Sequence, residues 1–401
     1  MPHNAPTLAR PRELVCARAR DVPSESAHLD PHFGGVCAGV RCSGAMKTSP
    51  RVAEKLLPTP REIVAYLDRH VIGQERAKRT VAIAAYNHLK RCENKTAAGK
   101  RLIKKSNLLL IGPTGCGKTH IARTLAEFLD VPFAVADATE YTEAGYYGKD
   151  VEVMIAELLH KCGQNVEEAQ RGVVFIDEVD KIARRTHSAR TGAGARDIGG
   201  EGVQQGLLKL LEGREIFVPQ NLTQHWNKHD FTPVDTQDIL FIAAGTFTDL
   251  RLYQENRTVG FGSTGSDDRR SPPITEKELL DYGLLAEFLG RLPVRVELDP
   301  LSKDDLFQIL TVPSDSVVRE YQALLKLDGV DLRFEDEALR EVVQFSLRRK
   351  TGARTLRALV EEICHEVMFE APERRGETIV IDAQTASTRL ARLGEGAGAR
   401  D

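Results

Sequence analysis

The sequence predicts an α/β protein in which helices sandwich a five-stranded parallel sheet, followed by a smaller, mostly helical unit. Three observations predict this fold. Apolar runs of strand length alternate with helical patterns up to residue 298, an amphipathic helical region precedes the first run, and helical spacing dominates after residue 299. The apolar runs cover residues 108–111, 133–136, 173–176, 239–243 and 294–298.

Ordered structure is expected to begin at Thr59. Thr59 as N-cap, Pro60 at the first helical position and Glu62 at the third form a capping box. Apolar residues at helical spacing predict a helix after it, and Gly73 permits a break before a second helix. Residues 90–105 are predicted to form a polar connection to the first strand.

Four segments are expected along the chain. Residues 1–57 mix Pro, Gly, Ser, Ala and Arg without apolar periodicity, which predicts a poorly ordered tail. Residues 58–298 are predicted to form the large subdomain and residues 299–385 the small one. Residues 386–401 are predicted to be a flexible tail, because the last stretch is rich in Gly and Ala.

Composition narrows the class of protein. The 401 residues contain 55 Lys and Arg against 58 Asp and Glu, a net charge of −3 that gives no bulk attraction to nucleic acid. Hydrophobic residues make up 41%, and no apolar run approaches the ~18 residues that span a bilayer, so no membrane segment is predicted. Seven scattered cysteines favour a reducing, cytoplasmic compartment over a disulfide framework.

A phosphate-binding loop follows the first predicted strand and opens a helix. Its glycines allow backbone N–H groups to surround phosphate oxygens, and the lysine ammonium can reach the β- and γ-phosphates. The final threonine hydroxyl can bind Mg²⁺. The alternative, a glycine-rich turn with an incidental Lys-Thr, does not explain the strand and helix around it. The loop consists of Gly112, Pro113, Thr114, Gly115, Cys116, Gly117, Lys118 and Thr119.

Two carboxylates end the third predicted strand. Asp177 is expected to hold Mg²⁺ through water, and Glu178 to polarise an attacking water molecule. Because parallel sheets bind ligands at the carboxyl ends of their strands, this pair belongs beside the phosphate loop. A solvated acidic corner is the alternative reading. Together the two motifs predict hydrolysis of a bound nucleotide rather than its storage.

With both motifs in place, residues 59–382 resemble the ClpX family of AAA+ unfoldases. The resemblance also rests on Val71-Ile72-Gly73-Gln74, which matches the family segment that packs on adenine. Further matches lie at residues 136–139, 143–146, 171–172, 201–205, 287–293 and 350–354. The resemblance implies a P-loop NTPase of the AAA+ class that assembles as a homo-hexameric ring.

The resemblance also implies roles for individual residues. Arg291 would reach the γ-phosphate of the neighbouring subunit, and Arg354 would sense nucleotide from the small subdomain. Tyr146 and Tyr147 would grip unfolded or tagged protein substrates in the pore, and residues 184–196 would form a second pore loop. Val259, Gly260 and Phe261 would dock a ClpP-type peptidase. For each side chain a structural role remains open: a surface ion pair, core packing or an ordinary loop position.

The sequence departs from the family pattern at several positions. Cys16, Cys37 and Cys42 lack the number and spacing of the family's N-terminal zinc-binding domain, so no zinc site is predicted. Gln224-His225-Trp226 replaces the family's Arg-Lys-His in an axial loop, and Tyr147 replaces a valine. Thr246 ends the fourth strand, where many AAA+ proteins place a polar sensor, and its role stays open.

Other functions compete with this reading. HslU is disfavoured, because only 58 residues separate Lys118 from Asp177, too few for its inserted domain. A stand-alone protein-remodelling chaperone and an AAA+ ATPase that acts on nucleic acid remain open, the latter through the basic residues 184–196. A scaffold that binds nucleotide without hydrolysis conflicts with Lys118 and Glu178.

Overall fold

The computed structural model describes residues 57–94, 103–142, 149–183, 200–219, 231–250, 273–349 and 351–395. Its centre is a sheet of five parallel strands in the order β2-β3-β6-β1-β7. The predicted fold is therefore confirmed. The strands are β1 (Leu108–Ile111), β2 (Phe133–Asp137), β3 (Val173–Asp177), β6 (Leu240–Gly245) and β7 (Val294–Glu297).

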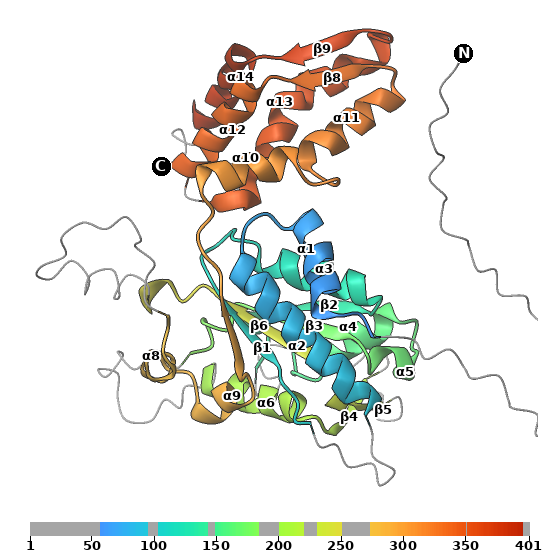
Figure 1. Ribbon diagram of the computed structural model, residues 1–401, viewed down its shortest axis with the longest axis vertical. Helices are drawn as coiled ribbons and strands as arrows, with labels where there is room; N and C mark the ends of the chain where they lie inside the picture. Colours follow the sequence, from blue (N-terminus) through green and yellow to red (C-terminus); the bar gives the residue numbers. More distant parts are fainter. Residues whose placement is uncertain are drawn as a thin grey trace, which may run out of the picture. The chain divides into compact units, whose positions relative to one another are not determined.

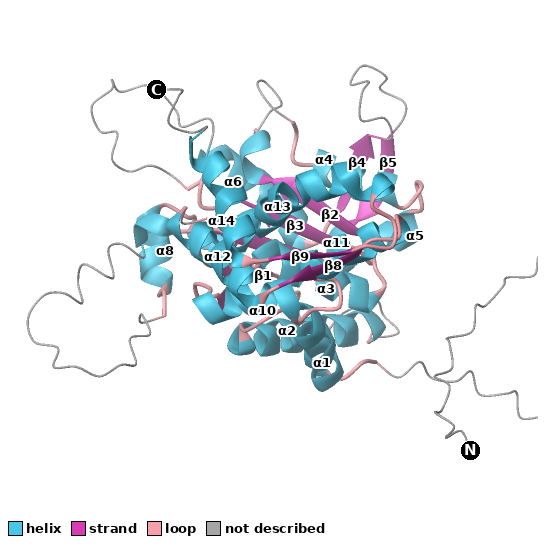
Figure 2. Cartoon of the chain, turned by 90° about the horizontal axis from the view of Figure 1, so that it is seen from above, coloured by secondary structure: helices cyan, strands magenta, loops and turns pink. Residues whose placement is uncertain are grey.

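Both faces of this sheet are covered by helices (Figures 1 and 2). Leu108 and Leu110 share a core with α1 (Pro60–His70), α2 (Glu75–Glu93) and α3 (Lys118–Leu129). Leu109 and Ile111 point to the other face. There they meet α4 (Val153–Lys161), α6 (Gly200–Glu212), α8 (Glu276–Tyr282) and α9 (Ala286–Gly290). Burial on both faces explains why these strands read as continuous apolar runs.

The first helix begins as its sequence predicts. The Glu62 N–H donates to Thr59 Oγ1 at 3.3 Å, and the Thr59 N–H donates to Glu62 Oε2 at 2.7 Å, which completes the capping box. Gly73 and Gln74 both have positive φ, at +65° and +58°. The chain therefore breaks between α1 and α2 at the predicted glycine.

A two-stranded antiparallel hairpin of β4 (Glu215–Pro219) and β5 (Phe231–Asp235) was not expected from the sequence. Only Ile216, Val218 and Val234 point inward, and prolines in both strands argue against strand structure. Three short elements complete the large part of the molecule: η1 (Ala138–Glu140), α5 (Val166–Ala169) and η2 (Thr236–Asp238).

The residues after β7 build a separate hydrophobic core from helices and a two-stranded parallel sheet. Short apolar stretches at helical spacing account for this mostly helical unit, as the sequence predicts. Its elements are α10 (Lys303–Thr311), α11 (Val317–Leu327), β8 (Asp331–Phe334), α12 (Asp336–Arg348), η3 (Gly352–Thr355), α13 (Leu356–Glu370), η4 (Ala371–Glu373), β9 (Thr378–Ile381) and α14 (Ala383–Glu395).

The expectation of a flexible tail from residue 386 is wrong as far as residue 395. Helix α14 covers this stretch, and Ala386 and Leu390 are fully buried in the core of the helical unit. Asp382 begins the helix, because its Oδ1 accepts a hydrogen bond from the Thr385 N–H at 2.7 Å. The Gly and Ala content predicts a tail, but apolar residues spaced i, i+4 place one face of a helix on the core, and this burial stabilises the helix. Residues 396–401 lie outside the described part.

The length and polarity of the helices show whether any of them could span a membrane. Within the residues that the structure describes, no helix is both long enough and apolar enough to cross a bilayer. The longest of these helices, α2, is interrupted by charged side chains along its length.

Candidate nucleotide-binding site

The phosphate loop lies between β1 and α3, at the carboxyl end of β1 (Figure 1). Gly115 and Gly117 adopt φ values of +76° and +99°, which L side chains rarely reach. A Cβ at Gly112 would lie within 3 Å of Cys116 Sγ and Leu298 Cβ. The loop therefore requires glycine at these positions, and Cys116 is buried beneath it.

Lys118 begins α3 and turns back over the loop. Its Nζ donates to the carbonyl oxygens of Gly112 at 2.7 Å and Pro113 at 3.0 Å, and the side chain is buried. These contacts hold the ammonium at the loop instead of letting it extend into solvent. Thr119 follows in the first helical turn. Positive charge and the N-terminus of an α-helix thus coincide, an arrangement suited to anions.

A segment of the helical unit packs backbone to backbone against the phosphate loop. The Ala353 N–H donates to the Gly115 carbonyl at 3.3 Å, and a Cβ at Gly115 would come within 2.6 Å of the Thr351 carbonyl oxygen. Gly352 has φ +60°, and its own Cβ would meet Thr114 at 3.0 Å. Glycines on both sides permit this close approach, and Arg354 lies exposed in the same short helix η3.

The turn at residues 71–74 lies against the same loop. Val71 is buried in one core with Cys116, and His120 Nε2 lies 3.1 Å from the carbonyl oxygen of His70. The Gln74 amide donates to the Asp299 carbonyl at 2.7 Å and accepts from the Asp299 N–H at 3.0 Å. This double hydrogen bond ties the turn to the chain just after β7.

The buried side chain of Lys78 stabilises the turn at residues 71–74. Its Nζ donates to the Val71 carbonyl at 3.3 Å and pairs with Asp68 at 2.5 Å and Glu75 at 2.9 Å. A buried ammonium is tolerable here because two carboxylates and a carbonyl surround it. Val71 and Ile72, expected at the adenine, are thus held in a turn that is anchored at both ends.

The acidic pair lies at the carboxyl end of β3. Asp177 Oδ1 accepts a hydrogen bond from the Glu178 N–H at 2.9 Å, and Glu178 takes a left-handed φ of +59°. Burial raises the pKa of Glu178, and the carboxylates of Asp137, Asp177 and Asp180 raise it further, while Lys181 opposes them. A carboxylate whose pKa is raised is better able to accept a proton from water.

Asp137 joins this cluster from the neighbouring strand, a position that sequence reasoning did not assign to the site. It ends β2 directly opposite Asp177 in the parallel register. Its Oδ1 accepts from the Thr139 N–H at 2.9 Å and from the Thr139 hydroxyl at 2.6 Å. Carboxylates that end two adjacent strands are the signal that could have predicted it.

Thr246 contacts a buried carboxylate. Its hydroxyl donates to Asp180 Oδ2 at 2.9 Å and its N–H to Asp180 Oδ1 at 3.1 Å, and Asp180 is only 4% exposed. A Cβ at Gly245 would come within 2.9 Å of Asp180 Oδ1, so this carboxylate fills the space beside the end of β6. Asp180 thereby joins the loop after β3 to the end of β6.

Arg291 is not brought to this site. It follows α9, its carbonyl accepts a hydrogen bond from the side chain of Asn107 at 3.0 Å, and its guanidinium pairs with Glu212 at 2.9 Å. Asn107 precedes β1, whereas the phosphate loop follows it, so the whole strand separates Arg291 from the loop.

Comparison with known proteins identifies two matching family models. Residues 103–295 match the AAA domain (Cdc48 subfamily), and residues 301–378 match the C-terminal D2-small domain of ClpB protein. An "ATP-dependent Clp protease ATP-binding subunit ClpX 2" of Wolinella succinogenes is 45% identical over 324 residues, 81% of this chain and 80% of that protein. The corresponding ClpX of Treponema denticola is 39% identical over 390 residues, 92% of each chain. The chain belongs to the ClpX family.

Membership in the ClpX family makes the chain an AAA+ ATPase and confirms the resemblance inferred from its motifs. The described residues bring together the phosphate loop, residues 71–74 and the segment that carries Arg354. The acidic pair lies at the same edge of the sheet, and β6 separates its strand from β1. The roles expected for these individual residues remain predictions.

Several residues expected to act in a ClpX family member lie outside the described part. They are Tyr146 and Tyr147 of the pore, residues 184–196, Gln224-His225-Trp226, Val259-Gly260-Phe261, and Cys16, Cys37 and Cys42. In the part of the chain that is described, no cluster of three or more His, Cys, Asp or Glu side chains is arranged to hold a metal ion.

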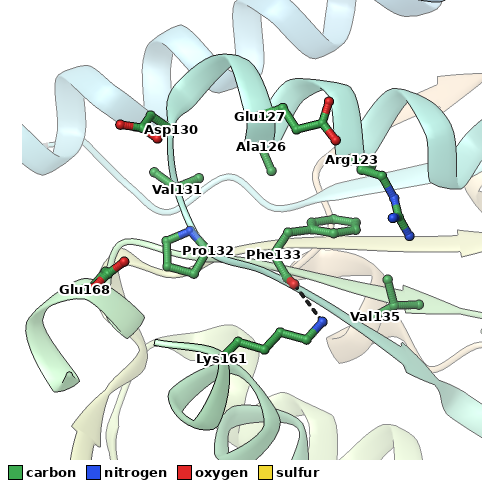
Figure 3. Close-up of a pocket in the computed structure, with 10 residues that line it drawn as sticks. All are labelled: Arg123, Ala126, Glu127, Asp130, Val131, Pro132, Phe133, Val135, Lys161 and Glu168. Atoms are coloured by element: carbon green, nitrogen blue, oxygen red, sulfur yellow. Dashed lines mark hydrogen bonds between the residues drawn. The ribbon is translucent and has the colours of Figure 1, made fainter. Parts of the chain in front are cut away.

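A cavity of about 620 Å³ lies beside the edge strand β2, near the far end of α3 from Lys118 (Figure 3). Lys161 Nζ donates across it to the Phe133 carbonyl at 3.0 Å, and the Arg123 guanidinium lies 5.7 Å from the Phe133 ring. Side chains of both charge signs line the cavity, among them Glu127, Asp130 and Glu168. It is separate from the nucleotide site of this ClpX family member.

Proposed function

We propose that the chain is an ATP-dependent protein unfoldase that threads polypeptide through the pore of a homo-hexameric ring and delivers it to a ClpP-type peptidase in the cytoplasm. Its relatives are named as ATP-binding subunits of an ATP-dependent Clp protease. The proposal extends the function in those names to this chain, and the site's chemistry supports the ATP-driven part of it.

The observation that carries the ATPase chemistry is that two motifs lie at the same edge of the sheet, on strands that only β6 separates. The phosphate loop follows β1, and Asp177 and Glu178 end β3, so both lie at the carboxyl ends of parallel strands. Lys118 supplies positive charge for the β- and γ-phosphates. Glu178, with its raised pKa, accepts a proton from the attacking water.

Thr119 and Asp177 suit Mg²⁺, which prefers hard oxygen donors. Asp177 is partly exposed, and the Glu178 N–H orients its carboxylate. When bound, Mg²⁺ neutralises charge on the phosphate oxygens. The surrounding Asp137 and Asp180 carboxylates add negative charge that favours a cation here.

The separation of Arg291 from the phosphate loop of its own chain supports a ring. Since β1 lies between them, Arg291 serves a nucleotide held by a neighbouring subunit. A guanidinium spreads charge over the oxygens of a transferring phosphoryl group. Arg354, next to the contact between Gly352 and Gly115, senses the nucleotide of its own subunit.

Substitutions at two residues test the ATPase assignment. Glu178→Gln should lower kcat by at least about 100-fold while ATP binding persists, since a general base contributes about 10² to 10⁴. Lys118→Ala should instead weaken ATP binding itself, measured by fluorescent-nucleotide titration. Unchanged turnover in the Glu178→Gln variant would refute the catalytic role.

A second experiment tests the partner. Deletion of Val259-Gly260-Phe261 should leave ATP hydrolysis and unfolding of a tagged domain intact and abolish degradation by added ClpP-type peptidase.

A third experiment tests the pore tyrosines. Tyr146→Ala should impair unfolding and spare basal hydrolysis, and the same assay with Tyr147→Val tests the second pore tyrosine. If the intact protein unfolds substrate and binds no peptidase, it is a stand-alone remodelling chaperone. Salt-sensitive binding of nucleic acid would instead favour the remaining alternative.

A further inference from the structure

The side chain of Arg291 pairs with Glu212, and other residues in turn fix the position of Glu212. Arg291 Nη2 donates to Glu212 Oε1 at 2.9 Å, and Arg214 pairs with Glu212 Oε2. We propose that Glu212 is a positioning residue for Arg291, one that orients the guanidinium toward the nucleotide of the neighbouring subunit. This inference rests on the proposed trans role of Arg291.

The ion pair leaves the guanidinium able to bind a second anion. Its hydrogen bond to Glu212 uses a single nitrogen, Nη2, and the Arg291 side chain is half exposed. A guanidinium carries five N–H donors in a rigid fork. One donor fixed on Glu212 therefore sets the direction of the fork, while its other edge can face phosphate oxygens.

The backbones of both partners are joined by one buried amide. Asn107 Nδ2 donates to the Arg291 carbonyl at 3.0 Å and to the Leu211 carbonyl, next to Glu212, at 3.3 Å. Asn107 is 1% exposed. Helices α6 and α9 pack side by side (Figure 1), so Glu212 and Arg291 project from a fixed base.

Glu212 is fixed from its other side by the base of the β4–β5 hairpin. The fully buried Thr236 hydroxyl, with its single proton, donates to either the Leu210 carbonyl at 3.1 Å or the Arg214 carbonyl at 3.0 Å, and it accepts from the Arg214 N–H at 3.0 Å. Arg214 is thereby placed where its side chain reaches Glu212. Glu212 is 22% exposed, so water competes only partly for its carboxylate.

This arrangement predicts a defect in turnover without a defect in nucleotide binding. Nucleotide contacts within one subunit do not involve Glu212, whereas the orientation of Arg291 matters in the transition state. Glu212→Gln keeps the shape of the side chain and removes its charge, and hydrogen bonds between ionised groups are roughly twice as strong as neutral ones. We expect kcat to fall roughly 10-fold, because a misplacement of about 1 Å in a catalytic group can cost about 100-fold.

The first experiment measures steady-state ATP hydrolysis by the full chain. Glu212→Gln should lower kcat and leave KM for ATP within about twofold of the parent, the signature of an interaction made only in the transition state. Glu212→Asp keeps the charge but withdraws it by one methylene, and should give a smaller loss of kcat. Glu215→Gln is the matched control, since Glu215 is exposed on β4, and should be unchanged.

A double-mutant cycle isolates the pair. In an Arg291→Ala background, Glu212→Gln should cause no further loss of kcat, and additive losses would overturn the inference. Glu178→Gln chains keep an intact Glu212–Arg291 pair, so in mixed rings they should restore turnover at the sites of adjacent Glu212→Gln chains. No recovery in verified mixed rings would overturn the inference as well.

Different outcomes refute the role of Arg291 and the role of Glu212. Unchanged kcat in the Arg291→Ala variant refutes the proposed role of Arg291. Loss of kcat in Arg291→Ala together with unchanged kcat in both Glu212 variants refutes only the positioning role. A Glu212→Gln chain that loses helicity by circular dichroism makes Glu212 a structural residue, and Glu212→Asp in the same cycle then decides the matter.

Discussion

The two ends of the five-stranded sheet gather different titratable side chains. At the carboxyl ends of the strands, four carboxylates gather, and their mutual repulsion adds to burial in raising the pKa of Glu178. At the amino ends, basic side chains gather beside Asp235 and Asp238, and burial lowers the pKa of Lys105 to about 7 and that of His88 to about 4. The groups are Asp137, Asp177, Glu178 and Asp180 at one end, and His88, Arg91 and Lys105 at the other.

The two ends differ in what balances the charge. Arg91 and Lys105 donate to the carbonyls of Gln237 and Thr236, both at 2.7 Å, and Arg91 also pairs with Asp238 at 3.5 Å, so the chain itself supplies their partners. Lys105 also lies 4.4 Å from the Phe241 ring centre. Glu178, at the carboxyl ends, instead has a left-handed backbone conformation and lies beside three other carboxylates. The contacts at the amino ends therefore stabilise the fold. At the carboxyl ends, the repulsion between carboxylates would be reduced by a bound cation.

The largest effect is expected from Asn107 at the amino ends. Asn107→Ala removes donors to the Leu211 and Arg291 carbonyls and an acceptor for the Phe241 N–H. All these partners are far away in sequence, and the groups of Leu211 and Phe241 would remain buried. We expect the free energy of unfolding to fall by about 3 kcal/mol, since each unsatisfied buried group costs about 1–3 kcal/mol. Urea unfolding of the nucleotide-free protein measures it.

The matched control is Asn94→Ala at the exposed end of α2. Asn94 Nδ2 donates to the Lys90 carbonyl at 2.9 Å, within one helical turn and in contact with water. We expect a loss below about 1 kcal/mol, as is usual for surface substitutions. Equal losses in the two variants would mean that the amino ends are no more rigid than the surface.

The difference between the ends also explains what the sequence could predict. The strands and the phosphate loop were predictable because apolar runs and glycine spacing are local signals that neighbouring residues carry together. Asn107 and Glu212 were missed, since their partners lie 184 and 79 positions away and no local pattern marks them. The hairpin was missed because Pro219 and Pro233 argue against strands, yet its inward side chains are buried.

The next effect is a pH dependence of stability set by Lys105. Burial lowers its pKa to about 7, with Arg91 as the next cause, while Asp235, Asp238 and Cys92 oppose the shift. The unfolded chain therefore binds a proton that the folded chain does not between pH 10.5 and 7. The contribution of Lys105 to stability is complete above that window and is lost as pH falls through it, by up to about 1.4 kcal/mol per pH unit.

Urea unfolding at pH 7, 8 and 9 checks this prediction. Lys105→Met loses the bond to the Thr236 carbonyl at every pH, but it should also lose the slope, whereas exposed Lys104→Met should keep it. His88, with its pKa near 4, acts only below this range. A parental slope that persists in Lys105→Met would assign the pH dependence to another group.

The smallest effect tests Thr246 at the carboxyl ends and decides between a structural role and a sensor role. Thr246→Ala removes the hydroxyl that donates to Asp180 Oδ2 and keeps the backbone N–H that donates to Oδ1. Because one donor to the buried carboxylate remains, we expect a loss of about 1–2 kcal/mol in the free energy of unfolding. Thr246→Ser keeps a hydroxyl and should recover most of it. Since the hydroxyl is engaged by Asp180, kcat and KM for ATP should change little in either variant. A large fall in kcat at unchanged stability would instead make Thr246 a nucleotide sensor, and the carboxyl ends would then contain one more residue that acts on the ligand.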